Sequence, residues 1–138
     1  MPWRQAPLDL VVCVDSSASF CLAKQRNPEP GLCRSQFVET GAFESAKLFV
    51  RRLARAMQTP EVQLGLIRFE DVGEVICPLT NALASFTSRL VGMEPSIGET
   101  RFAPALRRAL EMLRGARSPN GAAEPKAQAS QAVLVITD

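Results

Sequence analysis

The chain has 138 residues, 46% of them hydrophobic and 22% charged, which suits one domain over residues 1–138 and is too short for two domains of ordinary size. The net charge is +2 and the basic residues are scattered, so we expect no nucleic-acid partner. The absence of histidine excludes Ser-His-Asp and Cys-His catalysis, histidine-based acid/base catalysis and most zinc sites.

The sequence contains no candidate membrane span. No apolar run approaches the roughly 20 residues that cross a bilayer. The first residues, MPWRQAPLD, also lack the apolar stretch of a signal peptide. We therefore expect no membrane insertion by this segment, and we expect any targeting or anchoring sequence to lie outside it.

Strands and helices alternate along the first half of the chain. Residues 8–14 (LDLVVCV) form a Val-rich run, typical of a strand buried on both faces of a parallel sheet. Residues 43–57 carry apolar side chains at three- and four-residue steps, which predicts an amphipathic helix lying on the sheet. Residues 62–69 (VQLGLIRF) predict a second strand.

The alternation continues in the second half. Residues 74–79 (EVICPL) predict a strand at the edge of the sheet, because Pro78 cannot donate a backbone hydrogen bond. Residues 82–91 allow a short helix, and residues 102–113 allow another. The apolar residues on one side of this last helix are Leu106, Leu110 and Leu113.

The chain ends in a predicted loop and a further strand. Residues 115–131 are rich in Ala, Pro, Gly and Ser, which indicates a loop, and residues 132–137 (AVLVIT) predict another Val-rich buried strand. The whole pattern predicts an α/β fold, with a doubly wound, mostly parallel sheet and helices on both faces.

Two of the Val-rich strands end in an aspartate, Asp15 in VVCVD and Asp138 in LVITD. In doubly wound sheets, ligands bind beyond the carboxyl ends of the strands, where the winding reverses. Two neighbouring carboxylates repel each other unless a cation or a proton lies between them. The sequence therefore predicts a positive charge at this edge of the sheet.

The residues after the first aspartate suggest a metal ion. Asp15, Ser17 and Ser19 alternate in DSSAS, so their oxygens can point towards one spot. Hard oxygen ligands suit Mg²⁺, or Mn²⁺ and Ca²⁺, rather than zinc or copper. The alternative interpretation is that Asp15 merely ends a strand and that Ser17 or Ser19 caps a helix.

The four cysteines fall into two groups. Cys13 and Cys77 lie inside apolar runs and are expected to be buried structural thiols. Cys21 and Cys33 flank a polar segment that contains Pro and Gly, and a disulfide between them would imply an oxidising compartment. The alternative is two free thiols in a cytosolic loop.

Five segments in order resemble a von Willebrand factor type A domain, the family that includes integrin I domains. DSSAS resembles the D-x-S-x-S motif of the metal-ion-dependent adhesion site, and GETRFAPAL resembles the G-x-T-x-x-x-x-A-L segment. AFESAKLFVRRL is similar to the first helix and VQLGLIRFED to the second strand. VLVITD is similar to the strand and aspartate that open an I-T-D-G motif.

The resemblance implies a metal site and a role for each matched residue. It implies that Ser17 and Ser19 bind the metal through their hydroxyls, that Asp15 holds the site in part through water, that Thr100 supplies a further hydroxyl, and that Asp138 is the distal aspartate. An open coordination position would then take an Asp or Glu of a protein partner. This is binding chemistry, so we expect no enzyme.

The sequence departs from the family pattern at three places. Ala18 stands where many members have Gly. Glu99 stands beside Thr100 where Gly is common, and its carboxylate would strengthen metal retention, compete with an acidic ligand, or stay inert in solvent. An insertion at about residues 20–41 would emerge next to the metal face. We expect it to shape partner choice, with an unimportant surface excursion as the alternative.

A complete domain of this type continues past Asp138, so the resemblance implies a partial domain in which residues 132–137 lie at an exposed edge and Asp138 is prone to fraying. We expect the segment to belong to a larger extracellular or cell-surface protein. The alternative is a cytoplasmic module that scaffolds a multiprotein or ATP-driven complex, as in metal chelatases or copine-like proteins, and free thiols would favour it. A phosphatase of the haloacid dehalogenase type would need an aspartate where Ser17 stands.

Overall fold

The computed structural model describes residues 6–25, 36–115 and 129–138. The elements in chain order are β1 (Leu8–Asp15), α1 (Ala18–Cys21), β2 (Leu22–Gln25), β3 (Gln36–Glu39), α2 (Ala42–Ala56), β4 (Val62–Phe69), β5 (Gly73–Thr80), α3 (Leu83–Val91), α4 (Phe102–Gly115) and β6 (Ser130–Ile136). Every strand and helix that the sequence predicts is present. Most of the predicted loop at 115–131 lies outside the described residues.

Four strands form the main sheet, in the order β5-β4-β1-β6. β1 runs parallel to both of its neighbours, and β5 pairs antiparallel with β4. From β1 the chain crosses through α2 to β4 on one side, and it returns through α4 to β6 on the other side. The winding therefore reverses at β1, which confirms the predicted doubly wound α/β fold and makes the carboxyl end of β1 the expected binding edge.

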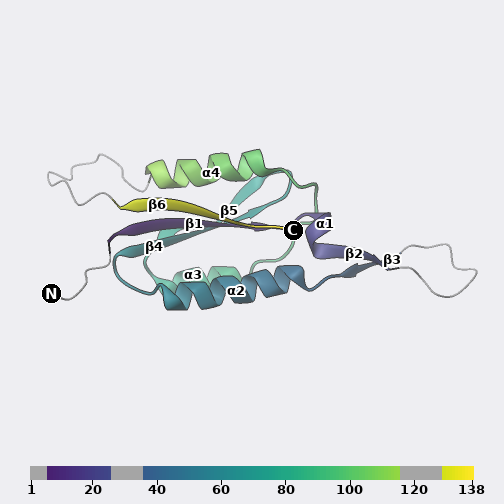
Figure 1. Ribbon diagram of the computed structural model, residues 1–138, viewed down its shortest axis with the longest axis horizontal. Helices are drawn as coiled ribbons and strands as arrows, with labels where there is room; N and C mark the ends of the chain where they lie inside the picture. The colour runs from purple at the N-terminus through teal and green to yellow at the C-terminus, as the bar shows by residue number, and fades with distance from the viewer. Residues whose placement is uncertain (1–5, 26–35, 116–128) are drawn as a thin grey trace, which may run out of the picture.

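Helices cover both faces of the sheet, as Figure 1 shows: α4 lies over one face, and α2 and α3 lie over the other. The α2 and α3 face buries large side chains, among them Val50, Phe86 and Leu90. The α4 face buries Ile67 and Phe69 of β4 against much smaller helix residues. Burial of these side chains is the main stabilising term of the fold.

The buried side of α4 differs from the predicted one. Its buried residues are Ala105, Ala109 and Leu113. Leu106 and Leu110, predicted to share the side of Leu113, are 42% and 48% exposed. The reason is close packing, because a Cβ on Gly73 of β5 would lie only 2.9 Å from the carbonyl oxygen of Pro104. This close approach at the start of α4 favours an alanine at position 105, whereas Leu113 is accommodated near the other end of the helix.

The two edge strands are less buried than the central ones. β5 forms one edge, as its exposed Pro78 predicts. β6 forms the other edge of the described sheet, and its residues are exposed or half-buried. The prediction of a fully buried strand was therefore wrong for β6. The prediction that this strand lies at an exposed edge agrees with the described sheet.

The insertion contains structure that the sequence did not predict. β2 and β3 pair antiparallel and extend away from α1 (Figure 1). Thr40 ties the end of β3 to α1, because its backbone N–H donates to the carbonyl of Cys21 at 2.9 Å and its hydroxyl donates to the carbonyl of Phe20 at 2.8 Å. The insertion therefore emerges beside the carboxyl end of β1.

The predicted disulfide is absent, because Cys21 has a free thiol. α1 turns this side chain into the core, where it is 4% exposed, while the predicted partner Cys33 lies outside the described residues. Cys13 and Cys77 are buried free thiols, as expected. In the part of the chain that the structure describes, no helix is long and apolar enough to cross a membrane.

Candidate metal-binding site

The carboxyl end of β1 buries three polar residues in succession. Asp15, Ser16 and Ser17 are each 0% exposed. The backbone N–H of Ser17 donates to Oδ1 of Asp15 at 2.7 Å, and the hydroxyl of Thr137, just after β6, donates to Oδ2 at 2.6 Å. One carboxylate oxygen is thus held by the segment that follows β1, and the other is held by the residue that follows β6.

Within the described part of the chain, Asp15 has no basic partner. The ion pairs among the described residues join other groups, and none includes Asp15. A buried carboxylate without a compensating charge is strongly disfavoured, even when neutral donors bind its oxygens. The negative charge of Asp15 is therefore not compensated by a described side chain, and a bound cation would compensate it.

Three hydroxyl groups converge next to this carboxylate. The Oγ atoms of Ser17 and Ser19 are 3.1 Å apart, and Oγ of Ser19 is 3.3 Å from Oγ1 of Thr100. Two oxygens on adjacent corners of an octahedral Mg²⁺ site, each at about 2.1 Å from the ion, lie about 3.0 Å apart. These separations fit a shared divalent ion as well as they fit hydroxyl hydrogen bonds.

Helix capping does not explain the serines. Ser17 occupies the N-cap position of α1, yet its side chain makes no capping hydrogen bond. α1 has only four residues, and Ser19 lies within it and is exposed. Instead of capping the helix, the two serine hydroxyls contact each other, and that of Ser19 also contacts the hydroxyl of Thr100.

Backbone contacts hold the Thr100 loop against the end of β1. The N–H of Ala18 donates to the carbonyl of Gly98 at 2.8 Å, and the N–H of Ile97 donates to the carbonyl of Ser16 at 2.9 Å. Gly98 is needed here, because a Cβ at this position would lie 2.7 Å from Cγ of Glu70. The two segments carrying the serines and Thr100 are thus fixed relative to each other.

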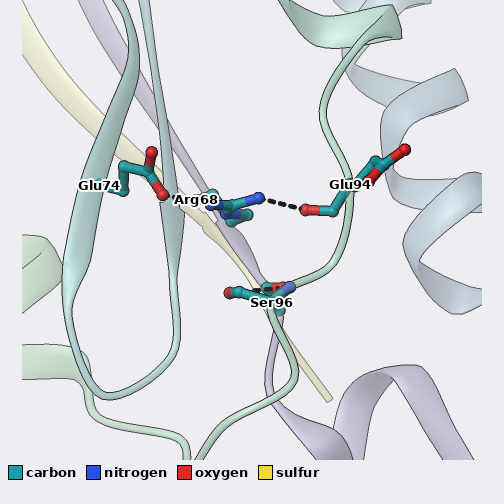
Figure 2. Close-up of polar contacts among 5 residues, drawn as sticks. Arg68, Glu74, Glu94 and Ser96 are labelled. Atoms are coloured by element: carbon teal, nitrogen blue, oxygen red, sulfur yellow. Dashed lines mark hydrogen bonds and ion pairs between the residues drawn. The ribbon is translucent and has the colours of Figure 1, made fainter.

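Side chains reinforce the same loop, as Figure 2 shows. The buried hydroxyl of Ser16 accepts hydrogen bonds from the backbone N–H and the hydroxyl of Ser96. Arg68 of β4 donates to the carbonyl of Glu94 and pairs with Glu74 of β5. These residues and Thr137 were not predicted as part of the site. The sequence signal that could have identified Arg68 and Thr137 is their position as polar residues at the carboxyl ends of β4 and β6.

Two predicted site residues stand apart from the cluster. Glu99 is 81% exposed and lies 3.8 Å from Arg101, while its backbone N–H donates to Asp71 at 2.8 Å. Its carboxylate therefore points to solvent. Asp138 is exposed at the end of the chain, next to Thr137, and forms none of the contacts that unite the other four predicted ligands.

Thiolate and carboxylate-rich metal sites are not found in the described ranges. No group of three or more His, Cys, Asp or Glu side chains lies close enough there to hold a metal. Burial raises the pKa of Cys13 to about 12 and is the main cause that raises the pKa of Cys21 to about 11. Both buried thiols therefore stay protonated at neutral pH in the metal-free chain.

Solved structures share this fold. An uncharacterised membrane-spanning protein from Vibrio fischeri is 21% identical, with a TM-score of 0.61 over 81% of this chain and 52% of its own. The von Willebrand factor domain of the type V pili tip protein Mfa5 from Porphyromonas gingivalis is 17% identical, with a TM-score of 0.59 over 81% and 34%. Proximal thread matrix protein 1 from the mussel byssus, with a zinc-occupied adhesion-site motif, is 16% identical, with a TM-score of 0.60 over 94% and 28%.

The chain spans about half of the Vibrio protein and about a third or less of the other two. No curated protein matches it. The family model for the von Willebrand factor type A domain, in contrast, matches residues 10–138, which include all but the first two residues of β1 and every element from α1 to β6. The chain therefore belongs to the von Willebrand factor type A domain family, whose members act as protein-interaction and adhesion modules.

Proposed function

We propose that this domain binds a divalent cation through the hydroxyls of Ser17, Ser19 and Thr100, and that the bound cation captures an Asp or Glu side chain of a protein partner. The observation that carries the proposal is the fully buried carboxylate of Asp15, which has no ion-pair partner among the described residues, beside the hydroxyls of Ser17, Ser19 and Thr100. Asp15 would hold the serine loop and balance part of the ionic charge. Asp138 would contribute a second carboxylate from the end of β6.

The composition of the ligand set favours binding over catalysis. The three hydroxyl ligands are neutral, and the carboxylates of Asp15 and Asp138 would at most balance the two charges of the ion, so the ion can still attract an incoming carboxylate. The site contains no histidine and no ionised thiol that could act as a base or nucleophile. We infer that the domain is a binding module and not an enzyme.

Mg²⁺ is the expected ion, because hard oxygen ligands at these separations suit it, with Mn²⁺ and Ca²⁺ as the next candidates. The mussel protein has zinc in its adhesion-site motif. Zinc therefore belongs in any test of this site, although ligand hardness alone argues against it.

A cell-surface location remains our proposal for the larger protein. The neighbours described as membrane-spanning and pilus-tip proteins support it indirectly. The free thiol of Cys21 favours the second candidate, a cytoplasmic scaffold in a multiprotein or ATP-driven complex, because the disulfide that would have indicated an oxidising compartment is absent. Both candidates use the same site chemistry.

The proposal can be tested by nuclear magnetic resonance of the full ¹⁵N-labelled chain. We expect Mg²⁺ or Mn²⁺ to perturb the amide signals of Ser17, Ser19 and Thr100. A capped aspartate, N-acetyl-aspartate N-methylamide, should then shift the same signals only when the metal is present, and the capped asparagine should not. Equal responses with and without metal would refute the proposed mode of binding, and so would signals that no divalent ion affects.

A further inference from the structure

A hollow opens beside the candidate metal site, between α1, the base of the β2–β3 hairpin, the start of α2 and the loop before Gly98. Its main lining residues are Cys21, Leu22, Glu39, Phe43, Pro95 and Ile97. Cys21 and Phe43 are each only 4% exposed and form an apolar floor. The hollow is therefore suited to an aliphatic stem rather than to a fully polar group.

The insertion supplies one wall of this hollow. Thr40 fastens the end of β3 to the end of α1, and its hydroxyl also accepts the N–H of Ala42 at 3.1 Å. Gly41 between them has a φ of 77°, a left-handed conformation that glycine adopts without strain. This turn sets Glu39 on the rim beside Gly41, where a chain without the insertion would have no side chain.

The rim of the hollow is acidic. Glu39 and Glu44 both line it, and among the residues that the structure describes none of the lining side chains is basic. Lys47 on α2 donates to the carbonyls of Val91 and Met93, and its ammonium group lies 3.6 Å from one oxygen of Glu44 and 5.8 Å from the centroid of the Phe43 ring, so Glu39 is the rim carboxylate that Lys47 does not pair with. An apolar floor with two carboxylates at its rim complements a long basic side chain.

Ile97 links the hollow to the metal site. It lines the hollow, is 47% exposed, and donates its N–H to the carbonyl of Ser16. Its φ of 53° lies in the left-handed region, which is a genuine outlier for a β-branched residue. Such strain persists where the surroundings hold it, and it concentrates at binding sites. Ile97 is thus an exposed apolar residue with a strained backbone that lies between the hollow and the candidate metal site.

We propose that this hollow is a second recognition subsite, which receives a lysine or arginine side chain of the same protein partner whose acidic group would bind the metal. The stem would pack on Phe43 and Ile97, and the cationic head would meet Glu39 and Glu44. Ile97 and Thr100 are three residues apart, at most about 11 Å along the chain. One short segment of a partner can therefore reach both. This proposal rests on the proposed metal-dependent function, and it adds the sequence preference of the ligand.

The subsite can be tested without metal, so its failure is distinguishable from failure of the metal site. The full ¹⁵N-labelled chain in EDTA is titrated with N-acetyl-arginine amide and N-acetyl-lysine amide, with N-acetyl-norleucine amide as the uncharged analogue. We expect saturable shifts of the Gly41, Phe43 and Ile97 amides, with the basic compounds binding at least about fivefold more tightly than the norleucine compound.

Variants that neutralise the rim carboxylates test whether Glu39 and Glu44 cause the preference for basic compounds. The double variant Glu39→Gln, Glu44→Gln should bring arginine binding down to the norleucine level. The matched control Glu61→Gln, Glu111→Gln removes two exposed carboxylates from other parts of the molecule and should leave it unchanged. The subsite would be overturned by equal binding of the charged and uncharged compounds, by shifts elsewhere only, or by equal losses in both double variants.

Discussion

Two regions at the same edge of the sheet are built in opposite ways. The first region, the candidate metal-site corner, follows directly from the central strand β1. Its residues Asp15, Ser16 and Ser17 are fully buried and are held by backbone hydrogen bonds to neighbouring segments. The acidic hollow is walled partly by an insertion, which Thr40 ties to α1. In the proposed function, the rigid corner would supply the metal chemistry, and the wall formed by the insertion would select the ligand.

The largest effect should come from Asp15→Asn, which removes the charge of the rigid corner and keeps its shape. We expect metal binding to become undetectable by calorimetry, because the ion loses its one buried counter-charge. The metal-free variant should be at least as stable as the original chain, since Thr137 can accept from the new amide. Thermal unfolding in EDTA and in Mg²⁺ separates the two effects, with Glu61→Gln as control. A variant that is less stable in EDTA and still gains stability from Mg²⁺ would contradict this reading.

A smaller loss is expected from Thr100→Ala, which removes one neutral hydroxyl from the corner. Metal affinity should fall at least about tenfold, about 1.4 kcal/mol, while the stability of the metal-free chain stays within about 0.5 kcal/mol. Thr87→Ala on α3 provides the matched control and should change neither quantity. Unaltered calorimetric titrations of Thr100→Ala would show that this hydroxyl is not a ligand.

Ser16→Ala tests whether Ser16 holds the loop from Ser96 to Thr100 in place. The variant removes the acceptor for both donors of Ser96, so the loop that leads to Thr100 should loosen. We expect the free energy of unfolding to drop by about 1 kcal/mol and metal affinity to drop about threefold to tenfold. Ser45→Ala, an exposed site on α2, serves as control. Lost stability with full metal affinity would mean that the Ser16 contact supports the fold alone.

The smallest effect is predicted for Ile97→Asn, at the border of the two regions. Asn tolerates a positive φ far better than Ile, so the free energy of unfolding should rise by up to about 1 kcal/mol. Metal affinity should stay the same, whereas binding of the capped arginine in the hollow should weaken. Denaturant unfolding measures the first effect. A destabilised variant would indicate that the packing of Ile97 outweighs its backbone strain.

The sequence predicted the elements well because their periodicities are local. Val-rich runs and three- to four-residue apolar steps identified strands and helices, and the family motifs brought together Asp15, Ser17, Ser19 and Thr100. Carboxylate and hydroxyl residues at the ends of strands could also be predicted to share a site, because the winding of the sheet places those strand ends at one edge.

The remaining features depend on tertiary distances that no local pattern encodes. The Ser16–Ser96 contact joins residues 80 positions apart, and the Thr137–Asp15 contact spans 122 positions. The alanine at position 105 on the buried side of α4 follows from how closely that helix approaches Gly73. The expected disulfide failed for a similar reason, since α1 turns Cys21 inward.

A crystal of the full chain grown with Mn²⁺ and measured at the manganese absorption edge gives the most direct answer. We predict an anomalous difference peak between the hydroxyl oxygens of Ser17, Ser19 and Thr100, within about 2.3 Å of each, beside the carboxylate of Asp15. Well-ordered hydroxyls with no peak among them at saturating Mn²⁺, or manganese bound only at other carboxylates, would contradict a cation-dependent site at the end of β1.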